Sequence, residues 1–286
     1  MRARRYSSEA LAIGLVLCGG LWAADQRPAT SPKHTCQEIE AFLRDAKIGV
    51  PRNAPKGVTQ PKHATFKLGE REHDAYIQTV HEAKSEFKSD RTTELNFKDF
   101  WEFNIAGYEL AKILELNMVP PYVDRKVLGG KQGSATWTVD GILEAQRIKE
   151  KRTPPNLEDW NHQMYVLRVF DQLIRDTDAN LTNFIVTSDW QLWRIDFTRA
   201  FRPHKDLLNP KDLVQCDRKL LANLRKLNKP LLQEKLGHYI DNMQIDGLLA
   251  RRDKIVQFFD GEIAKKGEAA VLFDLPRVGQ PCGVGL

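Results

Sequence analysis

The sequence predicts an α+β protein of two lobes, a strand-rich first half with one long helix and a mostly helical second half. Two observations predict this division. Paired short apolar runs separated by glycine turns fill the first half, and apolar residues at helical spacing fill the second. The chain has 286 residues, 42% hydrophobic and 28% charged, which is ordinary for a protein with a packed core.

Two β-hairpins are predicted in the first half. Residues 64–68 and 72–80 flank a turn that contains Gly69, and residues 122–127 and 134–139 flank a second turn that contains Gly129. Residues 81–95 are rich in charge and show no apolar alternation. We therefore expect an exposed connection there.

The long helix of the first half is predicted to begin at Asn96 and to end near residue 116. Asn96 is a favourable N-cap with Asp99 three residues later, and Leu95 and Phe100 are spaced as a hydrophobic staple. Prolines 120 and 121 end the helical pattern soon afterwards.

In the second half, Asn156 is predicted to cap a helix that runs to about residue 174, and two or three further helices are predicted between residues 217 and 266. The change from strands to helices falls near residue 140. The predicted units are therefore an N-lobe over 63–140 and a C-lobe over 141–286.

The N-terminus has the layout of a secretory signal peptide. Three arginines precede the uncharged stretch 10–24, which is shorter than the roughly 20 residues of a membrane-spanning helix. Residues 1–24 are the predicted signal, and residues 25–62 are a predicted linker with a short helix at 37–46. We expect an exported protein, periplasmic or secreted, with no membrane span after signal removal. An uncleaved start that anchors the chain is the alternative.

The net charge and the cysteines limit which partners and which disulfides the sequence predicts. Removing three arginines and one glutamate with the signal lowers the net charge from +5 to +3, and no basic run follows, so the sequence gives no case for nucleic-acid binding. Cys36, Cys216 and Cys282 remain without any C-x-x-C pattern. One disulfide and one free thiol are expected, with Cys36 and Cys282 as the pair because both lie near the chain ends.

The residues that indicate chemistry lie between positions 176 and 201. Two short apolar runs, 184–187 and 191–195, surround a turn at 188–190. Folding this hairpin about its midpoint, between 189 and 190, places Asn183 opposite Asp196. Asp178 precedes Asn183 by five residues, so two carboxylates and an amide are expected at one end of the hairpin. Such hard oxygen ligands suit Mg²⁺.

The pattern Asp178-x-x-x-x-Asn183, followed by a hairpin and Asp196-Phe197-Thr198, is similar to the catalytic centre of protein kinases. The structural alternative is an Asp/Asn-rich turn beside a surface hairpin, with the acidic residues as caps. The resemblance implies that Asp178 orients or deprotonates an acceptor hydroxyl. It also implies that Asn183 and Asp196 hold Mg²⁺ on the phosphates of ATP.

Further segments resemble the atypical branch that contains the phosphatidylinositol 3-/4-kinase-like and HipA-like kinases. Residues 104–121 look like the regulatory-helix segment of that branch, and residues 134–141 look like its strand into the hinge. The resemblance implies a two-lobed protein-kinase-like fold, with Trp137 and Val139 beside the nucleotide.

The sequence departs from that branch at an important pair. Gln78 stands where the ATP-binding lysine is expected, and Asn104 stands where its glutamate partner is expected. Replacing both charged residues by neutral amides can preserve a hydrogen bond between them, so a Gln78–Asn104 contact is predicted.

Three functions stay open at this point. The first is a Mg²⁺-ATP-dependent phosphotransferase acting on a hydroxyl of a lipid, a protein or a small molecule. The second is an exported pseudokinase that binds nucleotide or protein with little or no turnover. The third, a metal-dependent phosphohydrolase, would direct the same acids at water.

Overall fold

In a computed structural model of the protein, residues 34–53, 61–88 and 93–276 are described. The predicted signal peptide and Cys282 lie outside these residues. Cys36 is disulfide-bonded, and Cys216 is a buried free thiol. No helix in the described ranges is both long and apolar enough to cross a membrane.

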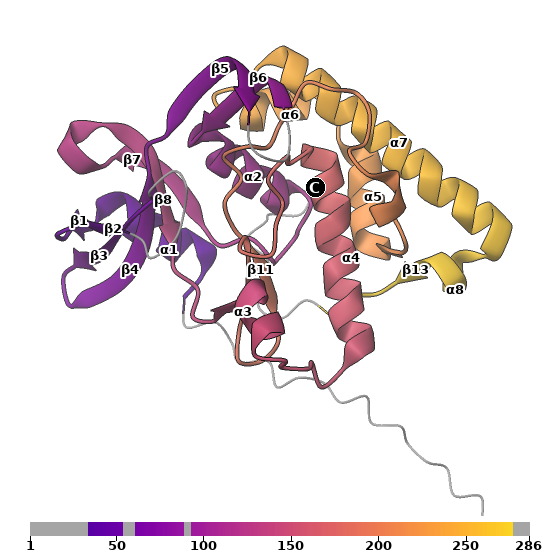
Figure 1. The fold of residues 1–286 in the computed structure, drawn as a ribbon, viewed down its shortest axis with the longest axis horizontal. Coiled ribbons are helices and arrows are strands. Elements are labelled where there is room, and N and C mark those ends of the chain that lie inside the picture. The colour runs from indigo at the N-terminus through magenta and orange to yellow at the C-terminus, as the bar shows by residue number, and fades with distance from the viewer. Residues whose placement is uncertain (1–33, 54–60, 89–92, 277–286) are drawn as a thin grey trace, which may run out of the picture. The chain divides into compact units, whose positions relative to one another are not determined.

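The N-terminal part contains an antiparallel sheet in the order β1-β3-β4-β8-β7, with β2 paired to β3 (Figure 1). Its strands are β1 (Lys47–Ile48), β2 (Arg52–Asn53), β3 (Lys62–Leu68), β4 (Arg71–Gln78), β7 (Tyr122–Lys126) and β8 (Gln132–Trp137). Both hairpins predicted from the glycine turns are confirmed, since β3 pairs with β4 and β7 pairs with β8. A short 3-10 turn, Leu128–Gly130, links the second pair.

The two faces of this sheet have different neighbours. Side chains alternate along a strand, so Ile77 packs with Phe42 and Leu43 of helix α1 (Cys36–Asp45), and Gln78 faces the other way. Helix α1 confirms the short N-terminal helix, and Thr35 closes its first turn with a capping box. The face that carries Gln78 is the one that meets α2.

Residues 81–95 are not an exposed connection, and that prediction is wrong. Residues 81–88 and 93–95 belong to a second antiparallel pair, β5 (His81–Lys88) and β6 (Thr93–Phe100), which is separate from the main sheet. Most of β5 is exposed. Because Phe87 is the one residue of β5 that is not exposed, the strand has no apolar alternation for a strand prediction to detect.

The predicted start of the long helix is also wrong. Asn96 lies inside β6, and helix α2 spans Glu102–Ile113. Asn96 has a φ of 53°, in the left-handed region rather than the extended one. Asp99 and Phe100 complete β6 and are therefore unavailable as helix-start residues.

The C-terminal part is mostly helical, and Asn156 caps helix α4 as predicted, accepting a hydrogen bond from the backbone N–H of Asp159 (3.1 Å). The helices are α3 (Glu144–Lys149), α4 (Leu157–Ile174), α5 (Arg218–Lys226), α6 (Lys229–Leu236), α7 (Asn242–Lys266) and α8 (Glu268–Val271), with a 3-10 turn at Pro210–Asp212. Short strands are β9 (Ile142–Leu143), β10 (Phe184–Val186), β11 (Leu192–Arg194), β12 (Cys216–Asp217) and β13 (Leu272–Phe273).

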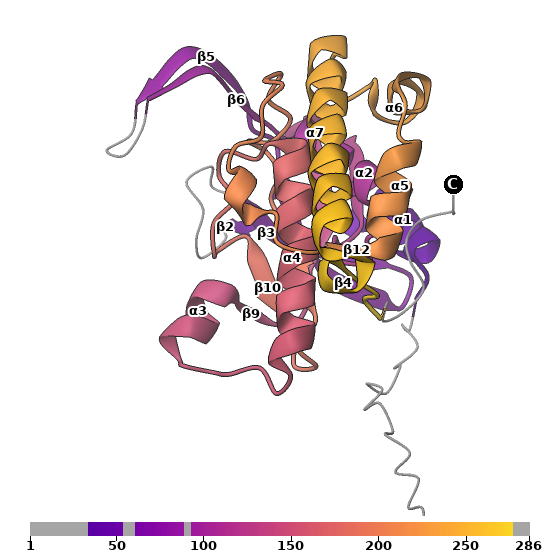
Figure 2. The same cartoon turned by 90° about the vertical axis from the view of Figure 1, so that its right-hand side faces the viewer.

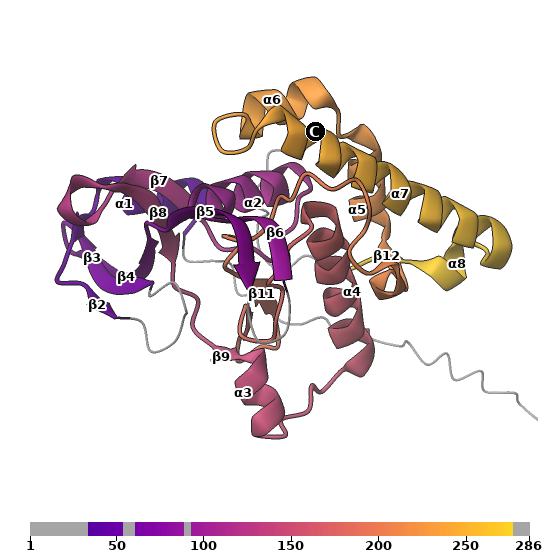
Figure 3. The same cartoon turned by 45° about the horizontal axis from the view of Figure 1, so that its top comes forward.

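Helix α2 connects the two parts. It contacts β7 and β8 on one side and α6 on another (Figure 3). Its buried residues belong to the same apolar cluster as those of α4, α5 and α7. Gly107 of α2 lies directly against the ring of Phe197, because a Cβ at this position would come within 2.8 Å of the ring. The helix is thereby packed onto the Asp196-Phe197-Thr198 segment.

Candidate active site

The hairpin that carries the predicted site residues forms, but its register differs by one from the prediction. Phe184 pairs with Arg194, so Asn183 lies opposite Ile195, whose N–H donates to the Asn183 carbonyl (3.0 Å). The turn is closed by the Thr187 N–H donating to the carbonyl of Gln191 (3.1 Å), which leaves an odd number of residues in the loop. Asn183 and Asp196 are therefore not a direct cross-strand pair.

A left-handed backbone at Asp196 changes the direction of its side chain. Its φ is 63°, uncommon for a residue other than glycine and often seen at functional sites. The Asp196 N–H donates to the hydroxyl of Tyr122 (3.1 Å), and Asp196 Oδ1 accepts a bond from Thr198 Oγ1 (3.1 Å). Tyr122 of β7 and Thr198 of the same segment thus hold a conformation that an extended strand would not adopt.

Asp178 and Asn183 are joined within one loop. Asn183 Nδ2 donates to the Asp178 carbonyl (3.0 Å), and the Asp178 N–H donates to Asp176 Oδ1 (2.9 Å). The side chain of Asp178 is 50% exposed and lies 3.5 Å from Arg199 Nη1. Burial raises the pKa of Asp178, Arg199 lowers it, and the negative charge of Asp196 raises it again. Asn183, which binds the Asp178 carbonyl, also accepts the Ile195 N–H, so this loop lies beside the residue that precedes Asp196.

Arg194 lies beneath this loop and binds it from the protein interior. This residue was not identified from the sequence. It is fully buried, and its guanidinium pairs with Asp171 (3.0 Å) and with Asp176. Arg194 Nη1 also donates to the carbonyls of Ile195 and Asp196. The sequence does offer a signal for this cluster. Asp171 and Asp176, on either side of the end of α4, and Arg194 in β11 are charged residues within apolar segments.

The predicted Gln78–Asn104 contact is confirmed. Asn104 Nδ2 donates to Gln78 Oε1 and lies 3.3 Å from Ser134 Oγ of β8. Asn104 Oδ1 accepts a bond from the Phe197 N–H (2.7 Å). One fully buried amide therefore connects the sheet, α2 and the residue that follows Asp196.

The structure does not bring Trp137 together with Gln78 and Asn104. Trp137 packs with the cluster on the α1 face of the sheet, where its ring stacks on His73 (3.2 Å between centroids) and meets Phe42 edge-on. Val139 lies two residues beyond β8, in the link to β9. The two predicted adenine-side residues thus fall on and after the end of β8, away from the amide pair.

The oxygen atoms of Asn183 and Asp196 are of the kind that bind a hard cation, which would take its other ligands from water or a bound molecule. Because Asn183 Nδ2 is used within the loop, Asn183 Oδ1 and a carboxylate oxygen of Asp196 are the atoms that would hold such a cation. In the described part of the chain, no three His, Cys, Asp or Glu side chains gather as a metal site of their own. Mg²⁺ commonly takes one or two carboxylates and completes its shell with water and phosphate oxygens, which fits these residues.

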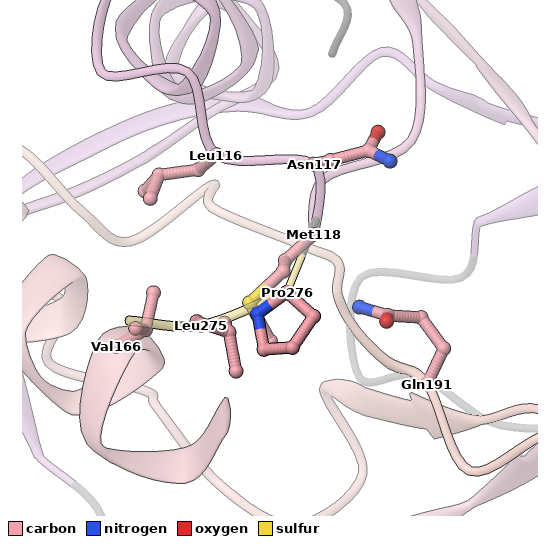
Figure 4. A pocket seen from close by; sticks show the side chains of 7 residues that line it. All are labelled: Leu116, Asn117, Met118, Val166, Gln191, Leu275 and Pro276. Atoms are coloured by element: carbon pink, nitrogen blue, oxygen red, sulfur yellow. The ribbon is translucent and has the colours of Figure 1, made fainter. Parts of the chain in front are cut away.

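Two hollows elsewhere do not involve these residues. One is a cavity of about 20 Å³ between α4 and the C-terminal segment, which is lined by Leu116, Asn117, Met118, Val166, Gln191, Leu275 and Pro276 (Figure 4). It has room for about one water molecule. The other is an open groove between α5 and α7. Neither supplies an alternative site with converging catalytic groups.

No protein-family model and no curated protein matches this sequence. Among solved structures, the Golgi casein kinase superposes with a TM-score of 0.55 at 12% identity, covering 85% of this chain and 79% of that chain. The proinflammatory kinase CtkA of Helicobacter pylori gives 0.39 at 11% identity, over 80% of this chain and 96% of that one. A LepB fragment of Legionella pneumophila gives 0.42 at 12% identity, over 67% and 46%.

Of these three likenesses, the one to the Golgi casein kinase supports an argument, and that argument concerns the fold. It agrees with the curled antiparallel sheet followed by a helical part. The protein therefore has a two-lobed protein-kinase-like fold.

Proposed function

We propose that the protein is a kinase-like phosphotransferase that uses Mg²⁺-ATP and acts on a hydroxyl group. The observation that carries the proposal is the joining of Asp178 and Asn183 in one loop, with Asn183 bonded to Ile195, the residue before Asp196. A protein-kinase-like fold supports the same reading. The acceptor class, whether lipid, protein or small molecule, stays open.

The roles follow from the groups present. Asp178 has a half-exposed carboxylate with a raised pKa, which suits a group that orients an acceptor hydroxyl and accepts its proton. Asn183 Oδ1 and Asp196 would hold the metal. Mg²⁺, when bound, would neutralise charge on the transferred phosphoryl group. Arg194 fixes the loop, so these atoms need little reorganisation.

The test is an ATP-turnover assay on the purified protein with Mg²⁺ present and absent, with water and a panel of hydroxyl compounds as acceptors. Faster ATP consumption with an added acceptor, together with phosphate found on that acceptor, supports the transferase. Consumption that no acceptor changes indicates the phosphohydrolase, and binding without consumption indicates a pseudokinase.

The pseudokinase is a second candidate because a specific observation favours it. The neutral Gln78–Asn104 pair keeps the link between sheet and helix but supplies no positive charge to a phosphate. A charge-assisted hydrogen bond is roughly twice as strong as a neutral one, so nucleotide would bind more weakly than with a lysine at position 78. The proposed export of the chain, with residues 1–24 as signal, also suits this candidate because ATP is scarce outside the bacterial cytoplasm.

Restoring the charged pair should strengthen nucleotide binding. The double variant Gln78→Lys with Asn104→Glu places a lysine beside the phosphates while keeping it paired, and we expect Mg²⁺-ATP affinity to rise about tenfold, which corresponds to roughly 1.4 kcal/mol. The measurement is calorimetric titration. Gln78→Lys alone is the matched control, and it should destabilise the protein because it buries an uncompensated charge. Unchanged affinity in a folded double variant would show that the nucleotide does not bind at this pair.

A further inference from the structure

In the sequence, the β5–β6 hairpin lies between the strand that carries Gln78 (β4) and the helix that carries Asn104 (α2). Figure 2 shows it as a long two-stranded arm, separate from the main sheet. Its base is fixed on two sides. The Trp101 N–H donates to the Val80 carbonyl (2.8 Å), and the Phe100 N–H donates to the carbonyl of Thr198 (2.9 Å). The arm is therefore bonded directly to the segment that follows Asp196.

Glu94 of β6 reaches from this arm to the catalytic loop. Its Oε2 pairs with Arg199 Nη2 (2.8 Å), and its Oε1 pairs with Arg202. Thr177, the residue before Asp178, donates its hydroxyl to the same carboxylate (3.3 Å). The Glu94 side chain is 15% exposed, so water screens these contacts only weakly.

Arg199 is held on three sides. Glu94 binds one terminal nitrogen, and the other terminal nitrogen lies 3.5 Å from Asp178 Oδ1. The guanidinium also lies over the rings of Phe97 (5.1 Å) and Phe87 (5.5 Å), which stack on each other across the arm. The Arg199 guanidinium thus contacts Glu94 and the two rings of the arm, and it also contacts the Asp178 carboxylate.

We propose that the β5–β6 hairpin is a positioning element for the reaction, in which Glu94 holds Arg199 in place and Arg199 sets the position of the Asp178 carboxylate. Asp178 is half exposed, and its carboxylate has Arg199 on one side and a side-chain hydrogen bond with Asn180 on its own loop. The inference rests on the proposed function, because it assigns a role in turnover. It adds Glu94, which belongs to none of the motifs that resemble kinases and lies 105 positions from Arg199 in the sequence.

A purely structural role for Glu94 is the competing explanation. Arg202 is only 3% exposed, burial lowers its pKa, and the charge of Glu94 opposes that effect. Removing Glu94 would therefore leave a buried cation without its acid. The two roles can be separated because the two carboxylate oxygens serve different arginines, one to Arg199 and one to Arg202.

The experiment compares turnover in four variants of the full chain. Arg202→Met removes the buried cation, and the double variant with Glu94→Gln then releases Arg199 without leaving Arg202 unpaired. Glu94→Gln alone is the direct variant. Glu86→Gln is the matched control, because Glu86 lies on the same arm and pairs with the exposed Lys88 (3.0 Å). For each, kcat, KM for ATP and the melting temperature are measured.

Positioning predicts that the double variant has a kcat about 10- to 100-fold below that of Arg202→Met, with KM for ATP within about twofold, since small misplacements of a reacting group have effects of this size. Glu86→Gln should match the unaltered protein. A double variant with the kcat of Arg202→Met would overturn the positioning role even if Glu94→Gln alone fails to fold. An unaltered protein without any turnover would overturn the proposed function, and this inference with it.

Discussion

Replacing Asp178 by asparagine is expected to lower phosphoryl transfer about 10²- to 10⁴-fold, the usual contribution of a positioned proton acceptor. Asparagine keeps the size of the side chain but cannot accept the hydroxyl proton. The backbone carbonyl of Asp178, which holds Asn183, is unchanged by this substitution. Mg²⁺-ATP affinity should therefore remain within a few-fold of that of the unaltered protein.

The matched control is Asp189→Asn, in the turn of the same hairpin, where the carboxylate accepts a bond from Thr187 and lies away from the loop of Asp178. It should retain full turnover. Equal turnover in the Asp178→Asn variant and the unaltered protein would show that Asp178 is not the proton acceptor.

The second large effect concerns Arg194. We expect Arg194→Met to lower the free energy of unfolding by about 3–5 kcal/mol, because it leaves Asp171 and Asp176 buried without their cation. It also removes the bonds from Arg194 to the carbonyls of Ile195 and Asp196. Urea denaturation followed by circular dichroism measures the change.

The control for this prediction is Arg218→Met, which removes an exposed ion pair with Glu268 (2.7 Å) and should cost less than about 1 kcal/mol. Adding Asp171→Asn and Asp176→Asn to Arg194→Met should recover part of the loss, since the buried charges are then gone. A small effect of Arg194→Met, similar to that of Arg218→Met, would contradict the role assigned to the buried cluster.

The sequence was sufficient where a local pattern determines the structure. Glycine turns between apolar runs predicted β3–β4 and β7–β8, and an Asn at the start of an apolar helical pattern predicted α4. The Gln78–Asn104 contact could be predicted because one residue replaces each member of a known pair. These signals are short-range or come directly from the resemblance.

Other features depend on contacts that no local pattern encodes. The strands β5 and β6 are exposed on much of their surface, so their sequence resembles a charged connection. The one-residue register error at Asn183 arose because turn geometry, set by the bonds between Thr187 and Gln191, decides the pairing. Glu94 and Arg199 meet across 105 positions, which spacing arguments do not reach.

Calorimetric titration of ATP with and without Mg²⁺ tests whether Asp196 and its neighbours form a Mg²⁺-nucleotide site. We expect binding to the unaltered protein that weakens at least about tenfold when Mg²⁺ is omitted, or when Asp196 is replaced by asparagine with Mg²⁺ present. In the Asp196→Asn variant, omitting Mg²⁺ should have little further effect. ATP binding that is absent, or equally strong in all four titrations, would show that Asp196 does not belong to a Mg²⁺-nucleotide site.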